Sequence, residues 1–244
     1  MNPHLRQGYG GQAILVALDV ETAAKAVELA ETLRGVVGGF KIGKQLFTAA
    51  GPAMVRELTS KGDRVFLDLK FHDIPNTVAG AVQSAVATGA WMVNVHASGG
   101  SAMMKAAAEA ARKTAASLDR PRPLVIAVTV LTSMDQGGLR EVGVSRSMID
   151  QVVHLAKLAQ SSGLDGVVAS PQEVAAIRNA CGPDFQIVTP GIRPADQQGK
   201  DDQARTLTPA EAVTAGASYL VIGRPITAAA NPREAAEKIS ATLP

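Results

Sequence analysis

A decapeptide, Asp68 to Thr77, places two carboxylates and an ammonium directly after the apolar run Val65 to Leu67. Its sequence is Asp-Leu-Lys-Phe-His-Asp-Ile-Pro-Asn-Thr. Because side chains alternate along a β-strand, Asp68 and Lys70 are expected on one face, with Asp73 where the strand turns into a helix. A lysine between two aspartates stays protonated, since opposite charges favour the ammonium. The pattern therefore indicates proton donation to a carbanion rather than Schiff-base chemistry, which needs a neutral amine.

Each of these charged residues also has a simpler structural explanation. Asp73 could cap the helix that follows it while Lys70 merely pairs at the surface, and Asp19 could cap the first helix. Lys41 could pack its aliphatic stem and extend its ammonium to the rim. Position favours a joint role, because Lys41 beside Asp68 and Lys70 would complete a row of alternating charges that keeps every member ionised.

The elements that must position these residues follow a repeating pattern of short apolar runs and helical segments. Eight runs are expected as strands: Ile14 to Leu18, Phe40 to Gly43, Val65 to Leu69, Trp91 to Val95, Leu124 to Val130, Gly166 to Ala169, Phe185 to Thr189 and Tyr219 to Ile222. Helices are expected at Glu21 to Arg34, Pro52 to Lys61, Thr77 to Thr88, Ser101 to Ala116, Ser147 to Ser161, Pro171 to Asn179, Pro209 to Ala215 and Arg233 to Ala241. Such alternation predicts parallel strands joined by crossover helices.

Polar residues follow each apolar run in turn, and this placement favours a closed barrel over an open doubly wound sheet. They are Asp19, Lys41, Asp68 with Lys70, His96, Thr132, Ser170, Arg193 and Arg224. In a barrel these strand ends form one ring around one mouth, where active sites of this fold are built. The sequence therefore predicts a single-domain (β/α)8 TIM barrel over residues 13–244, after a flexible leader of residues 1–12.

Two long loops are expected to leave the same mouth, at 132–146 and 193–205. Loops of this length at such a mouth are often lids, although plain disorder is the alternative.

Two glycine-containing segments point to a phosphate site. They are Thr189 to Arg193, after the seventh run, and Val221 to Pro225, after the eighth. Loops after strands 7 and 8 of a barrel often bind phosphate through backbone N–H groups, and Pro225 can open a short helix whose positive end faces an anion. Arg224 would add charge-assisted bonds. Either segment alone could be a turn glycine beside a solvated arginine, but together they favour phosphate.

The sequence gives weaker support for a catalytic histidine or a metal site. His96 ends the fourth run and could simply bond to neighbouring backbone, and His72 should point away from Lys70 by strand alternation, so neither is assigned to catalysis. Clustered His and Cys spacing is lacking, and Lys70 would compete with a cation for its aspartates, so no metal is expected.

Composition excludes several classes of protein. Hydrophobic residues make up 46% and charged residues 19% of the 244 residues, so a large core can form. The net charge of +2 and 3% aromatic content argue against nucleic acid as a partner. Cys181 is the only cysteine, and no run of about 18 apolar residues occurs, so a cytoplasmic protein that does not enter a membrane is expected.

Taken together, the motifs resemble the orotidine 5'-phosphate decarboxylase family over nearly all of the chain after Gln12. The resemblance is carried by Ala17-Leu18-Asp19, Lys41-Ile42-Gly43, Asp68 to Thr77, Val93 to Ala97, Val130 to Ser133, Thr189 to Pro194 and Val221 to Pro225. It implies a homodimeric barrel without metal or organic cofactor, which converts orotidine 5'-monophosphate to uridine 5'-monophosphate and carbon dioxide.

The resemblance also implies roles for individual residues. Lys70 would donate the proton, with Asp68 and Lys41 in its network and Asp73 supplied by the other subunit. Asp19 and Lys41 would contact the ribose, Thr132 and Ser133 the pyrimidine, and Arg193, Gln203, Gly223 and Arg224 the phosphate. The Gln203 assignment rests on the dipeptide Asp202-Gln203 alone. The expected substrate-binding set is Asp19, Lys41, Asp68, Thr77, Thr132, Ser133, Pro190, Arg193, Gln203, Gly223 and Arg224.

Two other functions stay open at this point. A magnesium-dependent sugar-phosphate decarboxylase or aldolase of the same superfamily would carry a similar Asp-x-Lys-x-x-Asp motif, but Lys41 stands where such enzymes need a carboxylate. A nucleotide-phosphate sensor without catalysis would keep only the anion site. Loss of activity on chelation would favour the first, and binding of nucleotide without its consumption the second.

Overall fold

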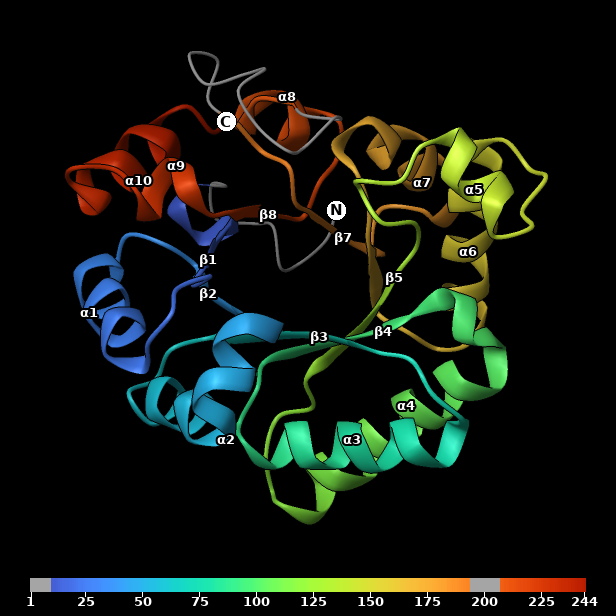
Figure 1. Cartoon of the computed structure of the whole chain (residues 1–244), viewed down its shortest axis with the longest axis horizontal. Helices are drawn as coiled ribbons and strands as arrows, with labels where there is room; N and C mark the ends of the chain where they lie inside the picture. The colour runs from blue at the N-terminus through green and yellow to red at the C-terminus, as the bar shows by residue number, and fades with distance from the viewer. Residues whose placement is uncertain (1–9, 194–206) are drawn as a thin grey trace.

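Each predicted apolar run forms a parallel strand, and the strands close into a barrel in the order β1 to β8. The computed structural model describes residues 10–193 and 207–244 (Figure 1). The strands are β1 Ile14–Ala17, β2 Gly39–Gly43, β3 Val65–Phe71, β4 Met92–His96, β5 Leu124–Val128, β6 Gly166–Val168, β7 Gln186–Thr189 and β8 Tyr219–Ile222. Ile14 pairs with Leu220, which closes the ring. The predicted (β/α)8 barrel is therefore confirmed.

Helices surround this barrel on the outside, as Figure 1 shows. Those in the described part of the chain are α1 Ala23–Leu33, α2 Lys44–Ser60, α3 Pro75–Ala87, α4 Gly100–Ser117, α5 Gln136–Glu141, α6 Met148–Ser161, α7 Val174–Cys181, α8 Pro209–Thr214, α9 Arg224–Thr227 and α10 Pro232–Ala241. Several of these helices begin at a side-chain N-cap, which accepts a backbone N–H of the first turn. The capping residues are Thr22, Ser147, Thr208 and Asn231.

Three helical segments differ from the sequence prediction. Helix α2 spans Lys44–Ser60, but the non-helical backbone of Gly51 (φ 66°, ψ −168°) divides it into two helical segments, so the helix predicted from Pro52 is present and a further segment precedes it. The Pro171 segment opens as a 3-10 turn, Pro171–Glu173, before α7. The long loop at 132–146 contains α5, capped by Asp135, so this loop is structured rather than disordered. Its closure as a lid stays a prediction.

The core has two parts, divided by the strands. Inside the barrel, alternate strand residues form a small apolar cluster of Leu15, Ala17, Phe66, Met92, Ile126, Val188 and Val221. The intervening residues point outward and pack under the helices in a much larger cluster. This alternation sets which residue at each strand end faces the mouth.

The start of the chain joins this core earlier than predicted. Gly11–Ala13 form a 3-10 turn, and a Cβ on Gly11 would lie 1.8 Å from the Val36 carbonyl oxygen. Gly11 and Gln12 therefore belong to the folded unit, whereas residues 1–9 of the expected leader lie outside the described residues. Within the described ranges, no helix is long and apolar enough to cross a membrane.

Candidate active site

A cavity of about 450 Å³ opens at the carboxyl ends of the barrel strands. Its floor includes Ala17, Phe66 and Val221 of the inner apolar cluster. Most residues predicted for the site line it: Asp19, Lys41, Asp68, Lys70, Thr132, Pro190, Arg193, Gly223 and Arg224. Of the predicted ring of strand-end residues, His96 and Ser170 do not line the cavity, and the others are brought together there.

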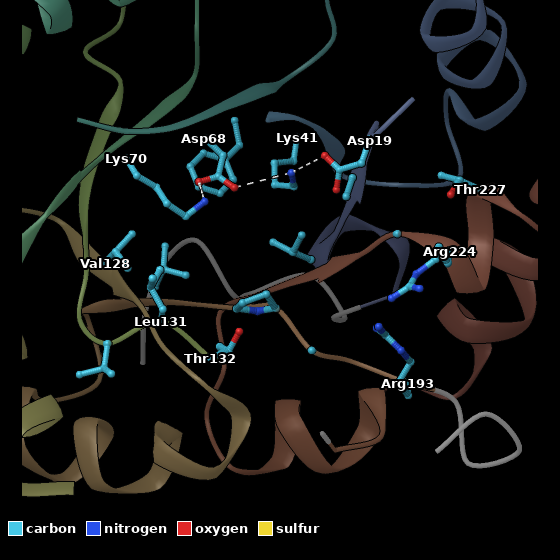
Figure 2. A pocket seen from close by; sticks show the side chains of 18 residues that line it. Asp19, Lys41, Asp68, Lys70, Val128, Leu131, Thr132, Arg193, Arg224 and Thr227 are labelled. Carbon is cyan, nitrogen blue, oxygen red and sulfur yellow. Dashed lines mark hydrogen bonds and ion pairs between the residues drawn. The ribbon is translucent and has the colours of Figure 1, made fainter. Parts of the chain in front are cut away.

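Four charged residues form a row along one wall of this cavity (Figure 2). Lys70 Nζ lies 2.6 Å from Asp68 Oδ1, and Lys41 Nζ lies 3.6 Å from Asp68 Oδ2. Lys41 Nζ also lies 3.0 Å from Asp19 Oδ1. The order is therefore cation, anion, cation, anion, as the sequence predicted for Lys41, Asp68 and Lys70.

Strand alternation explains why Lys41 faces the inside of the barrel. Its neighbours Phe40 and Ile42 pack outward in the larger core cluster, so the lysine between them must point inward. Only 9% of its side chain is exposed. The pair with Asp19 fits because β2 ends in Gly43, where a Cβ would lie 2.9 Å from both Asp19 Oδ1 and Lys41 Nζ.

The Asp68 carboxylate stays ionised although it is buried. Burial by itself would raise the pKa of Asp68, but Lys41 and Lys70 outweigh it and hold the pKa below its ordinary value. Hydrogen bonds from Lys70 and from Asn94 Nδ2 act in the same direction. The wall thus presents a fixed negative group between two ammonium groups.

Lys70 reaches its position through an unusual backbone conformation. Its φ of 54° lies in the left-handed region, which costs a non-glycine residue about 1–2 kcal/mol. The pairing of β3 with β4 also shifts register between Leu67 and Phe71. Strand alternation correctly predicted that Lys70 meets Asp68, but it did not predict this break in the strand.

The loops after β7 and β8 supply the second wall. In Figure 2 the guanidinium groups of Arg193 and Arg224 both point into the cavity. Arg193 is buried, at 7% exposure, and its backbone N–H is bonded to the Leu207 carbonyl. Arg224 opens the predicted short helix α9, with Gly223 as N-cap. Thr227 of α9 also lines the cavity, a residue that the sequence reasoning did not select.

Some predicted site residues lie away from this cavity. Asp73, Thr77 and Ser133 are exposed and do not line it. Asp73 Oδ1 accepts the N–H of Ile74 at 2.6 Å, and it forms no ion pair with any residue in the described ranges. It does not cap α3 either, whose N-cap is Ile74. Gln203 lies outside the described residues.

The histidines stand beside the charged row without entering the cavity. The rings of His72 and His96 have centroids 5.5 Å apart. Burial, with the nearby His72 and Lys70, lowers the pKa of His96 to about 4, so this ring is neutral at pH 7. Across residues 10–193 and 207–244, no group of three or more His, Cys, Asp or Glu side chains could hold a metal ion.

Asn94 is the residue of this site that the sequence reasoning missed. It is fully buried on β4, and its side chain joins both Asp68 and the backbone of Lys70. A signal was present, because an amide interrupts the apolar run Met92 to Val95 at an inward-facing position.

Comparisons with known proteins agree with this geometry. Residues 12–239 match the Orotidine 5'-phosphate decarboxylase / HUMPS family. Orotidine 5'-phosphate decarboxylase of Moorella thermoacetica is 58% identical over 231 residues, covering 94% of this chain and 91% of the relative. The enzyme of the same name from Paramagnetospirillum magneticum is 56% identical over 230 residues, covering 94% and 97%. The crystal structure of Orotidine 5'-phosphate decarboxylase from Lactobacillus acidophilus superposes with a TM-score of 0.82 at 38% identity, covering 94% of this chain and 98% of that one.

Proposed function

Because the chain belongs to the orotidine 5'-phosphate decarboxylase / HUMPS family, we propose that it converts orotidine 5'-monophosphate to uridine 5'-monophosphate and carbon dioxide. One observation carries the proposal: the Lys70 ammonium, 2.6 Å from Asp68, borders the same cavity as Arg193 and Arg224. A proton donor and a phosphate site are thus available to one small substrate.

Lys70 would act on the ring carbon that loses the carboxylate. The bond between that carbon and the carboxylate breaks, carbon dioxide leaves, and the electron pair stays on the ring carbon. Lys70 then transfers a proton to this carbon and regains one from water. Because negative charge on that carbon builds up during the reaction, a preorganised ammonium stabilises the transition state more than the bound substrate.

Asp68 would lie beside the substrate's carboxylate before it departs. Its depressed pKa keeps it charged, so the two carboxylates repel each other in the bound substrate and this repulsion is relieved as carbon dioxide leaves. Lys41, 3.6 Å from Asp68 and 3.0 Å from Asp19, bridges these two aspartates and would orient the ribose together with Asp19.

The opposite wall would hold the phosphate. Arg193 and Arg224 supply guanidinium donors, and Gly223 leaves the backbone open toward the cavity. Thr132 lines the cavity between the two walls (Figure 2) and would contact the pyrimidine, and Pro190 lines the same cavity. Binding energy from the phosphate is remote from the reacting carbon and can be used to position it. We therefore expect substrate without phosphate to lose turnover as well as affinity.

Asp73 is proposed to act across a homodimer interface. Its support is its position: in the single chain it is exposed beside Ile74, a large apolar side chain that is 67% exposed. A second copy placed over this start of α3 would cover Ile74 and bring Asp73 toward the partner's Lys70. We also propose a cytoplasmic location, where nucleotide substrates are available.

A turnover assay tests the proposed function directly. Purified protein is mixed with orotidine 5'-monophosphate, and the absorbance of the pyrimidine is followed with and without a chelator. We expect complete conversion that the chelator does not change. Binding without consumption would instead indicate a sensor, and loss of activity with the chelator would indicate the magnesium-dependent alternative.

Mixed dimers test the shared site. Lys70→Ala and Asp73→Ala proteins are each assayed alone and after subunit exchange. If Asp73 serves the partner's site, half of the sites in each hybrid are intact, and statistical exchange restores about a quarter of the normal turnover. If Asp73 serves its own chain, no site is intact and the mixture stays as inactive as its components.

A further inference from the structure

We infer that Asn94 is a positioning residue that fixes the Lys70 ammonium over the reacting carbon. The inference rests on the proposed function and deepens it, because it names a side chain outside the cavity lining on which the proton donor depends. Three hydrogen bonds meet at this position in the interior of the barrel.

The Asn94 amide is buried. Asn94 is 0% exposed, and it shares the inward face of β4 with Met92, which belongs to the inner apolar cluster. An amide in such a place is costly unless its polar atoms are bonded. Asn94 is therefore tolerated at this position only because its amide is hydrogen-bonded.

Both ends of the amide are used. Asn94 Nδ2 donates to Asp68 Oδ1 at 2.7 Å, and Asn94 Oδ1 accepts the backbone N–H of Lys70 at 2.8 Å. The donor and acceptor cannot be exchanged, because a carboxylate only accepts and a backbone N–H only donates. Asn94 therefore links the anion of the charged row to the main chain of the cation.

Strand β3 is broken opposite Asn94. Leu67 pairs with Val93 and Phe71 pairs with Val95, so three residues of β3 face the single residue Asn94. Within this bulge Lys70 adopts its left-handed conformation, and its N–H is bonded to a side chain instead of to the backbone of β4. Bulges next to active sites commonly redirect a side chain in this way.

Lys70, Asp68 and Asn94 form a closed ring of hydrogen bonds. Lys70 Nζ donates to the same Asp68 Oδ1 that Asn94 bonds, so the side chain and the backbone of Lys70 are both tied to the Asn94–Asp68 pair. Lys70 is thereby held both at its backbone N–H and at its ammonium group. Without Asn94, Asp68 could rotate and the Lys70 backbone could relax toward a regular strand.

Two variants and a matched control test this role. Asn94→Ala removes both bonds. Asn94→Asp keeps the shape and the acceptor for the Lys70 N–H but replaces the donor to Asp68 by a second carboxylate. The control is Ser218→Ala, which removes another buried polar side chain, at the opposite end of the barrel, where its Oγ accepts from the Ile187 N–H.

Each protein is assayed for kcat, KM, affinity for uridine 5'-monophosphate, melting temperature and the pH dependence of kcat. For Asn94→Ala we expect kcat to fall about 10- to 100-fold, the range seen when a hydrogen bond that orients a metal ligand is removed, while nucleotide affinity changes less than about threefold. The acidic limb of the kcat profile should move to higher pH in both variants. Asp68 loses a bond that favours its charged form, and in Asn94→Asp it also gains a like charge. Ser218→Ala should lower the melting temperature and leave kcat unchanged.

The outcomes separate the possibilities. Wild-type kcat in Asn94→Ala would overturn the inference, and so would a loss of kcat that merely parallels lost nucleotide affinity and melting temperature. Should Asn94→Ala fail to fold, the near-isosteric Asn94→Asp decides alone, since an unshifted acidic limb with normal kcat contradicts the role. Absence of turnover in the unchanged protein would overturn the proposed function itself, and the inference with it.

Discussion

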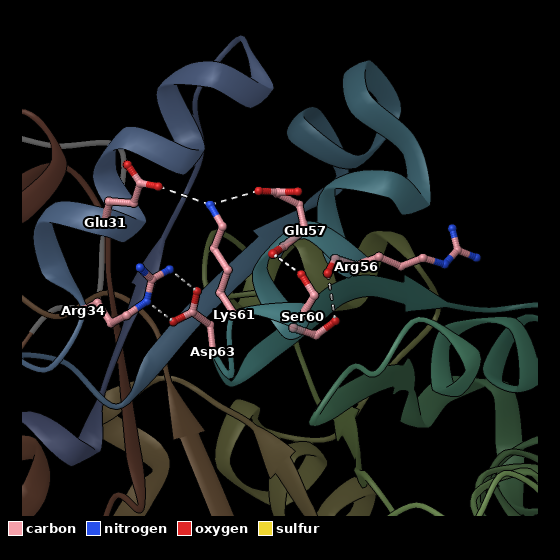
Figure 3. A network of polar contacts seen from close by, with 8 residues as sticks. Glu31, Arg34, Arg56, Glu57, Ser60, Lys61 and Asp63 are labelled. Atoms are coloured by element: carbon pink, nitrogen blue, oxygen red, sulfur yellow. Dashed lines mark hydrogen bonds and ion pairs between the residues drawn. The ribbon is translucent and has the colours of Figure 1, made fainter.

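The two ends of the barrel carry charge clusters of similar composition in opposite surroundings. At the mouth, two lysines and two aspartates form the row beside the cavity. At the other end, charged side chains from the end of α1, the end of α2 and the turn before β3 form a network on the outside (Figure 3). The difference lies in burial and in what each cluster faces.

The outer network ties neighbouring elements together. Lys61 Nζ lies 3.1 Å from Glu31 and 2.9 Å from Glu57, and these carboxylates are about half exposed. Arg34 forms a two-pronged bond to Asp63, at 2.9 and 2.7 Å. Arg34 and Lys61 are both paired, the left-handed backbone positions beside them are glycines, Gly35 and Gly62, and neither described pocket is lined by these residues. The arrangement is structural.

The mouth differs because both partners of the Lys41–Asp68 ion pair are buried and border an empty volume, whereas Asp63 of the outer network is buried beside an Arg34 side chain that is 37% exposed. Asp68 and Lys41 expose 12% and 9% of their side chains, and Lys70 tolerates a left-handed backbone to take part. Charges in such a site act far more strongly than at a surface that water and salt screen. Ion pairs alone therefore do not identify an active site, whereas burial, an adjoining cavity and local strain together do.

Lys70→Ala should give the largest effect. Removing the proton donor and the charge that stabilises the carbanion is expected to lower kcat by at least about 10³-fold. Affinity for uridine 5'-monophosphate should stay nearly normal, because the phosphate wall is untouched. The measurement is single-turnover kinetics beside a binding titration, and unchanged turnover would refute the role of Lys70.

Arg224→Ala should rank second. Loss of a charge-assisted bond to phosphate is worth about 1.5–3 kcal/mol, so kcat/KM is expected to fall roughly 10- to 150-fold. Steady-state assays on orotidine 5'-monophosphate and on orotidine without phosphate measure this. If Arg224 binds the phosphate, the variant loses little kcat/KM on the substrate without phosphate. An equal loss of kcat/KM on both substrates would contradict phosphate binding by Arg224.

Arg34→Ala probes the outer network. Asp63 is buried, with 5% of its side chain exposed, and would lose its two-pronged partner. Melting temperature should drop by a few degrees, about 2–4 °C for each kcal/mol lost in a chain of this size, with kcat unchanged. Lys61→Ala, at a more exposed pair, should change the melting temperature less. A fall in kcat for either variant would break the contrast between the two ends.

The smallest expected effect concerns His96 and pH. Its pKa of about 4 in the folded chain lies below the ordinary value near 6.5, so the unfolded chain binds a proton first as pH falls. The free energy of unfolding should therefore decrease between about pH 6.5 and pH 4, and His96→Phe should reduce this decrease. Urea unfolding at pH 7 and pH 5 measures it, and equal pH dependence in both proteins would contradict the assignment.

Much of the fold and site could be predicted because local patterns determined them. The eight apolar runs fixed strand number and order, and the polar residue after each run fixed the mouth. What sequence could not supply depends on contacts between distant segments. The conformation of Lys70 and the role of Asn94 arise from the packing of β3 on β4, and the helical segment at 44–50, before the break at Gly51, was not predicted from local patterns.

The most direct test of the central claim is a crystal structure of the protein with a pyrimidine nucleoside monophosphate bound. We expect the phosphate between Arg193 and Arg224, and Lys70 Nζ within about 3–3.5 Å of the ring carbon that carried the carboxylate, still hydrogen-bonded to Asp68. A structure in which the Lys70 amine turns to bulk solvent, away from the base, would contradict it.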